Sequence, residues 1–176
     1  HNLGLEIFLD LKFHDIPTTV HKACLEAYKL GVWMLNVHLL GGRDMLIAAR
    51  DARDSINPKL NLIGVTLLTS YNLDNMKMFN TNSREDVVNK LSQLAIESKI
   101  DGVVCSPSDI EIINKNKNDL KFITPGIRLD DRNHEHAKIY TPKSAINLGS
   151  SYLVIGRPIT EANDPMSVIN QINSQI

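Results

Sequence analysis

The sequence predicts an α/β fold in which short buried strands alternate with helices and form a parallel sheet. Six short segments are apolar or rich in β-branched residues and show little alternation, which is typical of strands buried on both faces. Segments with the helical repeat of apolar residues lie between them, and this alternation is the pattern of a parallel sheet with helices outside. The 176 residues contain no flexible linker and no charge block, so we expect a single domain over residues 1–176.

The six expected strands are taken in chain order from their apolar runs and the glycine or proline residues that bound them. They are 6–12 (EIFLDLK), 32–38 (VWMLNVH), 61–68 (NLIGVTLL), 102–106 (GVVCS), 120–125 (LKFITP) and 151–156 (SYLVIG).

The helices are expected from their end signals as well as from their periodicity. The segment 17–30 opens with a proline and is followed by a glycine, a common asymmetry of helices. The segment 84–99 follows Ser83, with Asp86 three positions on, which is close to a capping box. The remaining helices are expected at 42–52, from a Ser108 cap to about 116, from Pro142 to Gly149, and from Pro165 onward.

Two architectures fit this order: an open doubly wound sheet and a (β/α)8 TIM barrel. No Gly-x-Gly-x-x-Gly follows any expected strand, which weakens a dinucleotide-binding interpretation. A barrel needs eight units and the sequence shows six, beginning without an initiator methionine. We therefore expect a (β/α)8 barrel whose first two units are absent from this chain, leaving its N-terminal side incomplete.

Composition excludes several classes of partner. The chain has 20 acidic and 19 basic residues, a formal charge of −1, so there is no electrostatic reason to expect binding to nucleic acid or to an anionic membrane. No apolar run approaches the ~20 residues needed to cross a bilayer. Cys24 and Cys105 fit neither a disulfide framework nor a zinc motif, and a cytoplasmic location is expected.

The first expected strand ends in a cluster of charged residues. Asp10 and Lys12 are two positions apart, so their side chains point to the same face of the strand, and Asp15 lies in the turn beyond. Catalytic groups in such folds lie at the carboxyl edge of the strands. A structural ion pair that holds the strand end is the alternative, although it would be costly to desolvate.

A second group of residues follows the last two expected strands. Residues 124–128 (TPGIR) and 156–158 (GRP) would be the phosphate-binding loops after strands seven and eight of a barrel. Glycine allows backbone N–H groups to approach an anion, and arginine can bind two of its oxygens. Each pair is weak evidence alone, but together they favour a phosphorylated ligand. The polar segment 129–138 is long enough to close over it.

Other polar residues near strand ends have simpler explanations. Thr69 and Ser70 could bind a ligand or form an ordinary turn. His38 is more often a satisfied core or rim histidine, and Cys105 an inert core residue. The sequence presents no convincing set of metal ligands.

Residues 10–19 (DLKFHDIPTT) resemble the signature of the orotidine 5′-monophosphate decarboxylase family. The Asp-x-Lys-x-x-Asp-Ile-Pro string is highly specific, and the similarity continues in order along essentially the whole chain. It includes 36–38 (NVH), 65–70 (VTLLTS), 101–106 (DGVVCS), 124–128 (TPGIR) and 154–158 (VIGRP).

The resemblance implies a homodimeric barrel lyase of pyrimidine biosynthesis that converts orotidine 5′-monophosphate to uridine 5′-monophosphate (UMP) and CO2 without a metal or organic cofactor. By the family pattern Lys12 protonates C6 of the pyrimidine, and Asp10 lies beside the substrate carboxylate. Asp15 and Thr19 would reach into the neighbouring subunit's site. The remaining implied contacts are Thr69 to the base region and Arg128, Gly156 and Arg157 to the phosphate.

The sequence departs from the family pattern at several points. Thr18 stands where the family usually has Asn, and His136 takes the place of a phosphate-gripping Gln. The family's Asp on its first strand and Lys on its second have no counterpart here, so a non-catalytic nucleotide-binding fragment stays an alternative. A second alternative is a related barrel, a Mg²⁺-dependent sugar-phosphate decarboxylase or synthase, although residues 13–17 (FHDIP) argue against it.

Overall fold

The computed structural model describes residues 3–68, 71, 79–81, 83–115, 119–129 and 140–176. Its six strands pair in chain order as one parallel sheet, β1-β2-β3-β4-β5-β6. The strands are β1 Phe8–Phe13, β2 Met34–His38, β3 Asn61–Val65, β4 Gly102–Val104, β5 Lys121–Pro125 and β6 Tyr152–Val154.

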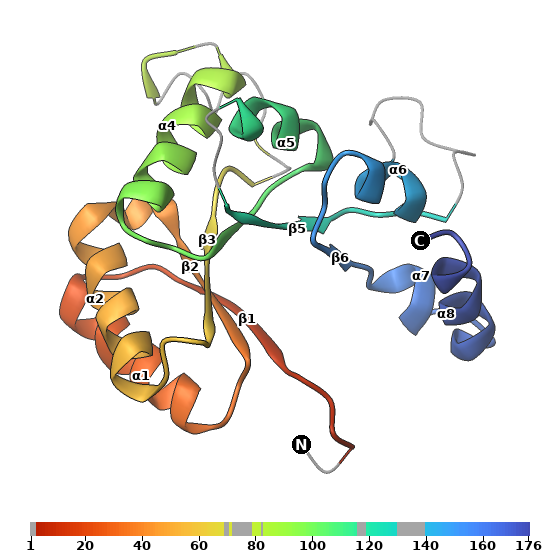
Figure 1. The fold of residues 1–176 in the computed structure, drawn as a ribbon, viewed down its shortest axis with the longest axis horizontal. Helices are drawn as coiled ribbons and strands as arrows, with labels where there is room; N and C mark the ends of the chain where they lie inside the picture. The colour runs from red at the N-terminus through yellow and green to blue at the C-terminus, as the bar shows by residue number, and fades with distance from the viewer. Residues whose placement is uncertain (1–2, 69–70, 72–78, 82, 116–118, 130–139) are drawn as a thin grey trace.

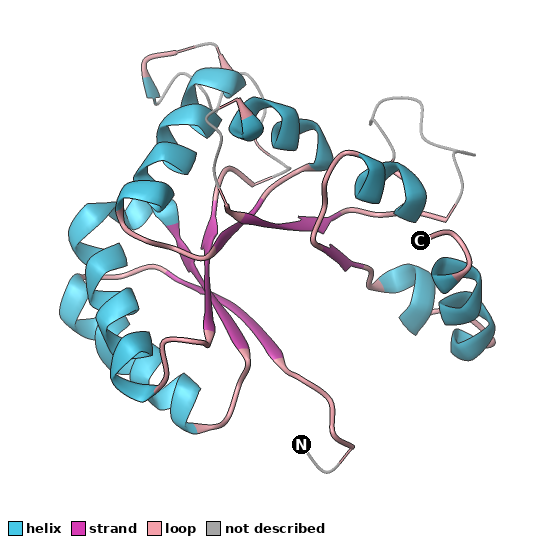
Figure 2. Ribbon diagram, in the orientation of Figure 1, coloured by secondary structure: helices cyan, strands magenta, loops and turns pink. Residues whose placement is uncertain are grey.

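The helices lie on one side of this sheet, and the sheet curls away from them (Figure 1; Figure 2). They are α1 Pro17–Lys29, α2 Gly42–Ile56, α4 Arg84–Glu97, α5 Pro107–Asn114, α6 Pro142–Asn147, α7 Arg157–Thr160 and α8 Pro165–Asn173, with a 3-10 turn, η1, at Leu39–Gly41. Within the described part of the chain, no helix is long and apolar enough to span a membrane.

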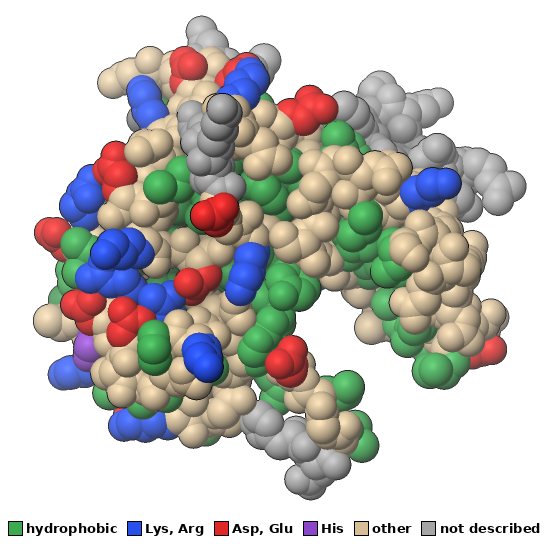
Figure 3. All heavy atoms as spheres, viewed as in Figure 1, with side chains coloured by type: hydrophobic (Ala, Val, Ile, Leu, Met, Phe, Trp, Pro, Cys, Tyr) green, Lys and Arg blue, Asp and Glu red, His purple; other side chains and the backbone are tan. Residues whose placement is uncertain are grey.

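The arrangement confirms the predicted alternating α/β fold and its barrel-like curvature. Six parallel strands form a curled half-barrel in which β1 and β6 are the outer strands. The space-filling view shows a deep notch between the N-terminal segment that leads into β1 and the C-terminal helices α7 and α8 (Figure 3).

The two faces of the sheet have different cores. On the outer face, Leu35 and Val37 of β2 pack in the large cluster that includes helix residues such as Val20 and Leu46. Residues of β2, β3 and β5 alternate onto the concave face, where a smaller cluster contains Met34, Ile63 and Ile123. This explains the apolar, non-alternating strands of the sequence, because both faces are buried.

Several element ends differ from their predicted positions. The strand predicted at 61–68 ends at Val65, which is the last residue of β3 that pairs with β4, opposite Val104. The hydroxyl of Thr66 then bonds to the Val104 carbonyl at the end of the ladder. The helix predicted from a Ser108 cap begins after Ser106 instead and is α5 of the structure. Pro107 occupies its first turn, and the Asp109 carboxylate accepts a hydrogen bond from the Ser106 N–H.

The helix predicted at 42–52 continues to Ile56 because the side chain of Arg53 is buried and bonds to Asp101, which precedes β4. The Ser83 cap was predicted correctly, since its side chain accepts a bond from the Asp86 N–H at 3.1 Å. The turns η1 and α7 are too short to have a periodic signal in the sequence.

Candidate active site at the carboxyl edge of the sheet

Asp10 and Lys12 lie together at the end of β1, as the strand alternation predicted. The Nζ of Lys12 donates to Oδ1 of Asp10 at 2.6 Å, and both side chains are partly exposed. The pair is therefore accessible to a ligand rather than sealed as a structural ion pair.

The backbone at Lys12 has an unusual conformation. Its φ is 52°, in the left-handed region that non-glycine residues seldom adopt, and the β1–β2 register shifts between Leu9 and Phe13. Strained residues of this kind persist only where neighbouring contacts hold them, and they cluster at functional sites.

Asn36 of β2 provides that contact, and the sequence analysis assigned it no role. Its side chain is fully buried, its Oδ1 accepts from the Lys12 N–H at 2.7 Å, and its Nδ2 donates to Asp10 Oδ1 at 2.5 Å. One amide thus fixes both the strained backbone and the carboxylate. The signal in the sequence was a lone amide inside the apolar run 32–38.

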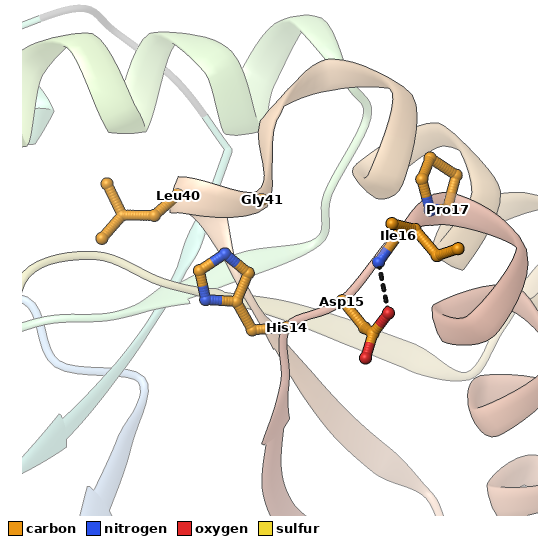
Figure 4. Close-up of a pocket in the computed structure, with 6 residues that line it drawn as sticks. All are labelled: His14, Asp15, Ile16, Pro17, Leu40 and Gly41. Carbon is orange, nitrogen blue, oxygen red and sulfur yellow. Dashed lines mark hydrogen bonds between the residues drawn. The ribbon is translucent and has the colours of Figure 1, made fainter.

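Asp15 is placed differently from Asp10. Its carboxylate accepts the Ile16 N–H at 2.7 Å, in the turn that leads into α1 (Figure 4). Within the described residues it forms no ion pair with Lys12, and Thr19 lies exposed in the first turn of α1. In this chain, both Asp15 and Thr19 face solvent rather than Lys12.

A cavity of about 490 Å³ opens beside this turn. It is lined by His14, Asp15, Ile16, Pro17, Leu40 and Gly41, so it lies between the β1–α1 turn and the segment after β2 (Figure 4).

His38 ends β2 on the same face as Asn36 and is half-buried, which agrees with the expected rim position. Its Nδ1 is nevertheless buried without a hydrogen-bond partner among the described residues, and its ring lies 5.4 Å from that of His14. Burial, followed by the nearby His14 and Lys12 charges, lowers the pKa of His38.

The predicted phosphate residues also come together. Arg128 and Arg157 line one pocket of about 250 Å³ with Pro158 and Glu161. Gly126, with φ of +81°, turns the chain after β5, and the Arg128 N–H then bonds to the Tyr140 carbonyl. Gly156 directly precedes α7, whose first residue is Arg157. The structure therefore provides a cationic pocket at the carboxyl edge of β5 and β6.

Three further expectations concern Thr69 and His136, Cys105, and metal ligands. Thr69 and His136 lie outside the described residues. Cys105 is buried, which raises the pKa of its thiol, as an inert core residue requires. Among described residues, no cluster of three or more His, Cys, Asp or Glu side chains could hold a metal ion.

Comparison with known proteins agrees with this geometry. Residues 1–172 match the family described as Orotidine 5′-phosphate decarboxylase / HUMPS. Proteins named orotidine 5′-phosphate decarboxylase from Nitrosomonas eutropha and Nitrosomonas europaea are 49% and 47% identical, over 99% of this chain and 76% of theirs.

A solved structure gives the same result. The crystal structure of orotidine 5′-phosphate decarboxylase from Lactobacillus acidophilus superposes with a TM-score of 0.82 at 38% identity, over 99% of this chain and 76% of that one. On the strength of this extended similarity in sequence and fold, the chain belongs to the orotidine 5′-phosphate decarboxylase family.

Proposed function

We propose that this protein decarboxylates orotidine 5′-monophosphate to UMP and CO2, with the charged edge of β1 as the reacting end of its site. The activity follows from membership of the family and from relatives that bear its name at up to 49% identity. The single observation that supports the chemistry is the accessible Lys12–Asp10 pair at the carboxyl edge of the sheet.

In this reaction the bond between C6 and the carboxylate breaks and its electron pair stays on C6. The pyrimidine ring offers no conjugated sink for that pair, so the site must stabilise the developing negative charge itself. A fixed ammonium at Lys12 does so electrostatically and then transfers a proton from Nζ to C6. The neutral amine afterwards regains its proton from solvent.

Asp10 keeps Lys12 charged before the reaction. Its carboxylate bonds to the amine and is itself fixed by Asn36, so its negative charge lies beside Nζ. We assign Asp10 to the neighbourhood of the substrate carboxylate, where like charges disfavour the bound ground state relative to the transition state.

The phosphate group binds at the opposite end of the site in this proposal. Arg128 and Arg157 share one pocket, and Gly156 leaves the backbone between β6 and α7 open to an anion. Binding energy from this remote group is used at the reacting carbon. By the family pattern, His136 is proposed to join the phosphate contacts and Thr69 to contact the base region.

We further propose a homodimer with shared active sites. Asp15 and Thr19 are exposed, and Asp15 does not reach Lys12 of its own chain, which is consistent with the family pattern in which both residues serve the neighbouring subunit. We also propose that residues 1–176 act as one domain, the half-barrel of six strands described above. We further propose that the protein is cytoplasmic, because its two cysteines are free and buried.

The deciding experiment measures CO2 release from orotidine 5′-monophosphate with and without EDTA, beside a sugar-phosphate substrate. The family description also covers the HUMPS group, so the second substrate is an informative control. Turnover of the nucleotide that is insensitive to EDTA supports the proposal. Metal-dependent turnover of the sugar phosphate would overturn it, and UMP binding without turnover would indicate a non-catalytic fragment.

The Lys12→Ala variant tests the assigned acid. We expect turnover to be abolished, because no other ammonium is assigned to C6, while UMP affinity changes by less than about tenfold. Lys29→Ala on α1, which removes an exposed ammonium paired with Glu26, is the matched control. Near-normal turnover of Lys12→Ala would remove Lys12 as the proton donor.

A further inference from the structure

Two histidines beside the proposed catalytic lysine have no part in the mechanism above. His14 follows β1 by one residue, and His38 is the last residue of β2. Their ring centroids are 5.4 Å apart and the ring planes are tilted by 38°. This spacing is within the range of direct aromatic contact.

His38 is held in an environment suited to a neutral ring. Its Nδ1 is buried and has no hydrogen-bond partner in the part of the chain that the structure describes. Burial lowers the pKa of His38, and the positive charges of His14 and Lys12 lower it further. A buried orphan nitrogen is unusual in a native structure and calls for an explanation.

The pair connects the β1–α1 turn with the segment that follows β2. His14 lies between Lys12 and Asp15, and its side chain projects toward Leu40 (Figure 4). Leu40 and Gly41 lie two and three residues after His38 and form the facing wall of the 490 Å³ cavity. The contact between the rings therefore bridges the β1–α1 turn and the chain leaving β2.

We propose that His38 is a positioning residue, whose neutral ring packs against His14 and holds the β1–α1 turn in register with the strand end that carries Lys12. This inference rests on the proposed function, since it assigns the pair to the same site. The ring contact adds to the strand pairing of β1 with β2 and to the bonds that Asn36 makes to Asp10 and Lys12.

A dependence on pH follows from the groups that face His38. His14 faces it from the β1–α1 turn and Lys12 from β1, while its partner on β3 is the uncharged Val65 and the next residues of its own chain are Leu39 and Leu40. A proton on His38 would add a positive charge beside Lys12 and His14, which weakens the ring contact. The contact between the His14 and His38 rings is therefore intact at neutral pH and is lost in acid.

The direction in which stability changes with pH follows from the linkage between protonation and folding. An imidazole whose pKa is lower in the folded protein favours folding while it is neutral. Its contribution to stability is therefore complete above the ordinary pKa of histidine and is lost as the pH falls from there to the lowered value. We expect the acid limb of the kcat/KM profile and the loss of thermal stability to occur in the same interval.

The experiment compares His14→Ala, His14→Phe and His38→Asn with the parent protein. His14→Ala removes the ring contact and is expected to lower kcat by at least about tenfold with a smaller change in KM, because the turn is no longer held. His14→Phe restores a ring without a charge, so it should recover most of that loss at neutral pH. It should also move the acid limb to higher pH, because the positive charge that helps to lower the pKa of His38 is gone. His38→Asn should abolish the acid limb and lower kcat at every pH.

His21→Asn is the matched control, because His21 is on α1 and its ring contacts the Ala48 carbonyl instead of the pair. The His38 ring is also followed directly by NMR titration. A His38 pKa at or above the ordinary value, or equal pH profiles for His14→Ala, His14→Phe and the parent, would refute the inference. If the parent itself failed to decarboxylate the nucleotide, the proposed function would fail instead, while the NMR titration would still test the pair.

Discussion

Lys12 combines a reactive amine with a strained backbone. Its positive φ is maintained by the bond from its N–H to Asn36, in a strand whose register shifts at that point. A left-handed conformation costs a residue with a side chain about 1–2 kcal/mol, and glycine is free of that cost. The strain places the amine beside Asp10 at the strand end.

The strain at Lys12 can be measured without reference to catalysis. Both Lys12→Ala and Lys12→Gly remove the amine, but only glycine adopts a positive φ without strain. We therefore expect the free energy of unfolding in urea to be about 1 kcal/mol higher for Lys12→Gly than for Lys12→Ala. On the exposed face of α1 the order should reverse, with Lys22→Gly less stable than Lys22→Ala by about 1 kcal/mol. The same order at both positions would contradict the strained conformation of Lys12.

Asn36 is expected to contribute to both stability and activity, because its side chain holds Asp10 and Lys12. Asn36→Ala leaves a buried N–H and the Asp10 carboxylate without their partner, so we expect a loss of about 1–3 kcal/mol in unfolding free energy. Displacement of Lys12 should also lower kcat/KM by about 10- to 100-fold. Asn170→Ala, on the exposed face of α8, is the control for urea titration and steady-state kinetics. A variant with unchanged kinetics would show that Lys12 needs no such support.

At the scale of the elements, the carboxyl ends of β1 and β2 present the reacting groups, and those of β5 and β6 present the arginines. Gly126 and Gly156 make these last turns. Arg157 is the first residue of α7, so its position depends on where β6 ends and this short helix begins.

The phosphate pocket predicts a difference between two substrates. Arg157→Ala should lower kcat/KM for orotidine 5′-monophosphate by about 100-fold or more, the cost of losing a charge-assisted contact. For orotidine, which lacks the phosphate, the same substitution should change kcat/KM little. Arg43→Ala, which breaks a surface pair with Glu97, is the control. Equal losses with both substrates would place Arg157 outside the phosphate site.

At the scale of the whole molecule, the sheet curls so that its carboxyl edge collects side chains from strands far apart in the sequence. Lys12 lies at the end of β1 and Arg157 begins the helix after β6, and these are the two outermost strands of the described sheet. The chain spans 76% of the length of its Nitrosomonas eutropha relative. Asp15 and Thr19 are exposed at the rim, where the proposed dimer would bring them to a second site.

The shared site can be tested by mixing two inactive variants. If Asp15 serves the neighbouring subunit, a mixed dimer of Lys12→Ala and Asp15→Ala contains one intact site, and random exchange should restore up to about a quarter of the parent activity. Lys12→Ala mixed with Asp10→Ala is the matched control, because both residues come from the same subunit and no intact site can form. No recovery in the first mixture, with exchange verified by chromatography of tagged subunits, would reject the shared site.

The sequence by itself determined the order of strands and helices, the buried parallel sheet, and the pairing of Asp10 with Lys12. These follow from local periodicity, end signals and strand alternation, all of which are contained within short segments of the sequence. The extension of α2 was missed because a contact between distant residues sets it, that of Arg53 with Asp101. The strand ends were missed because they depend on where pairing with the neighbouring strand stops, as at Val65 opposite Val104.

Only the tertiary structure decided how the charged strand end is held. The support from Asn36, the left-handed backbone of Lys12, and the contact between His14 and His38 depend on neighbouring strands and turns that pack within hydrogen-bond or van der Waals distance. A linear pattern does not encode such distances, because each depends on the register between strands and on the curl of the sheet.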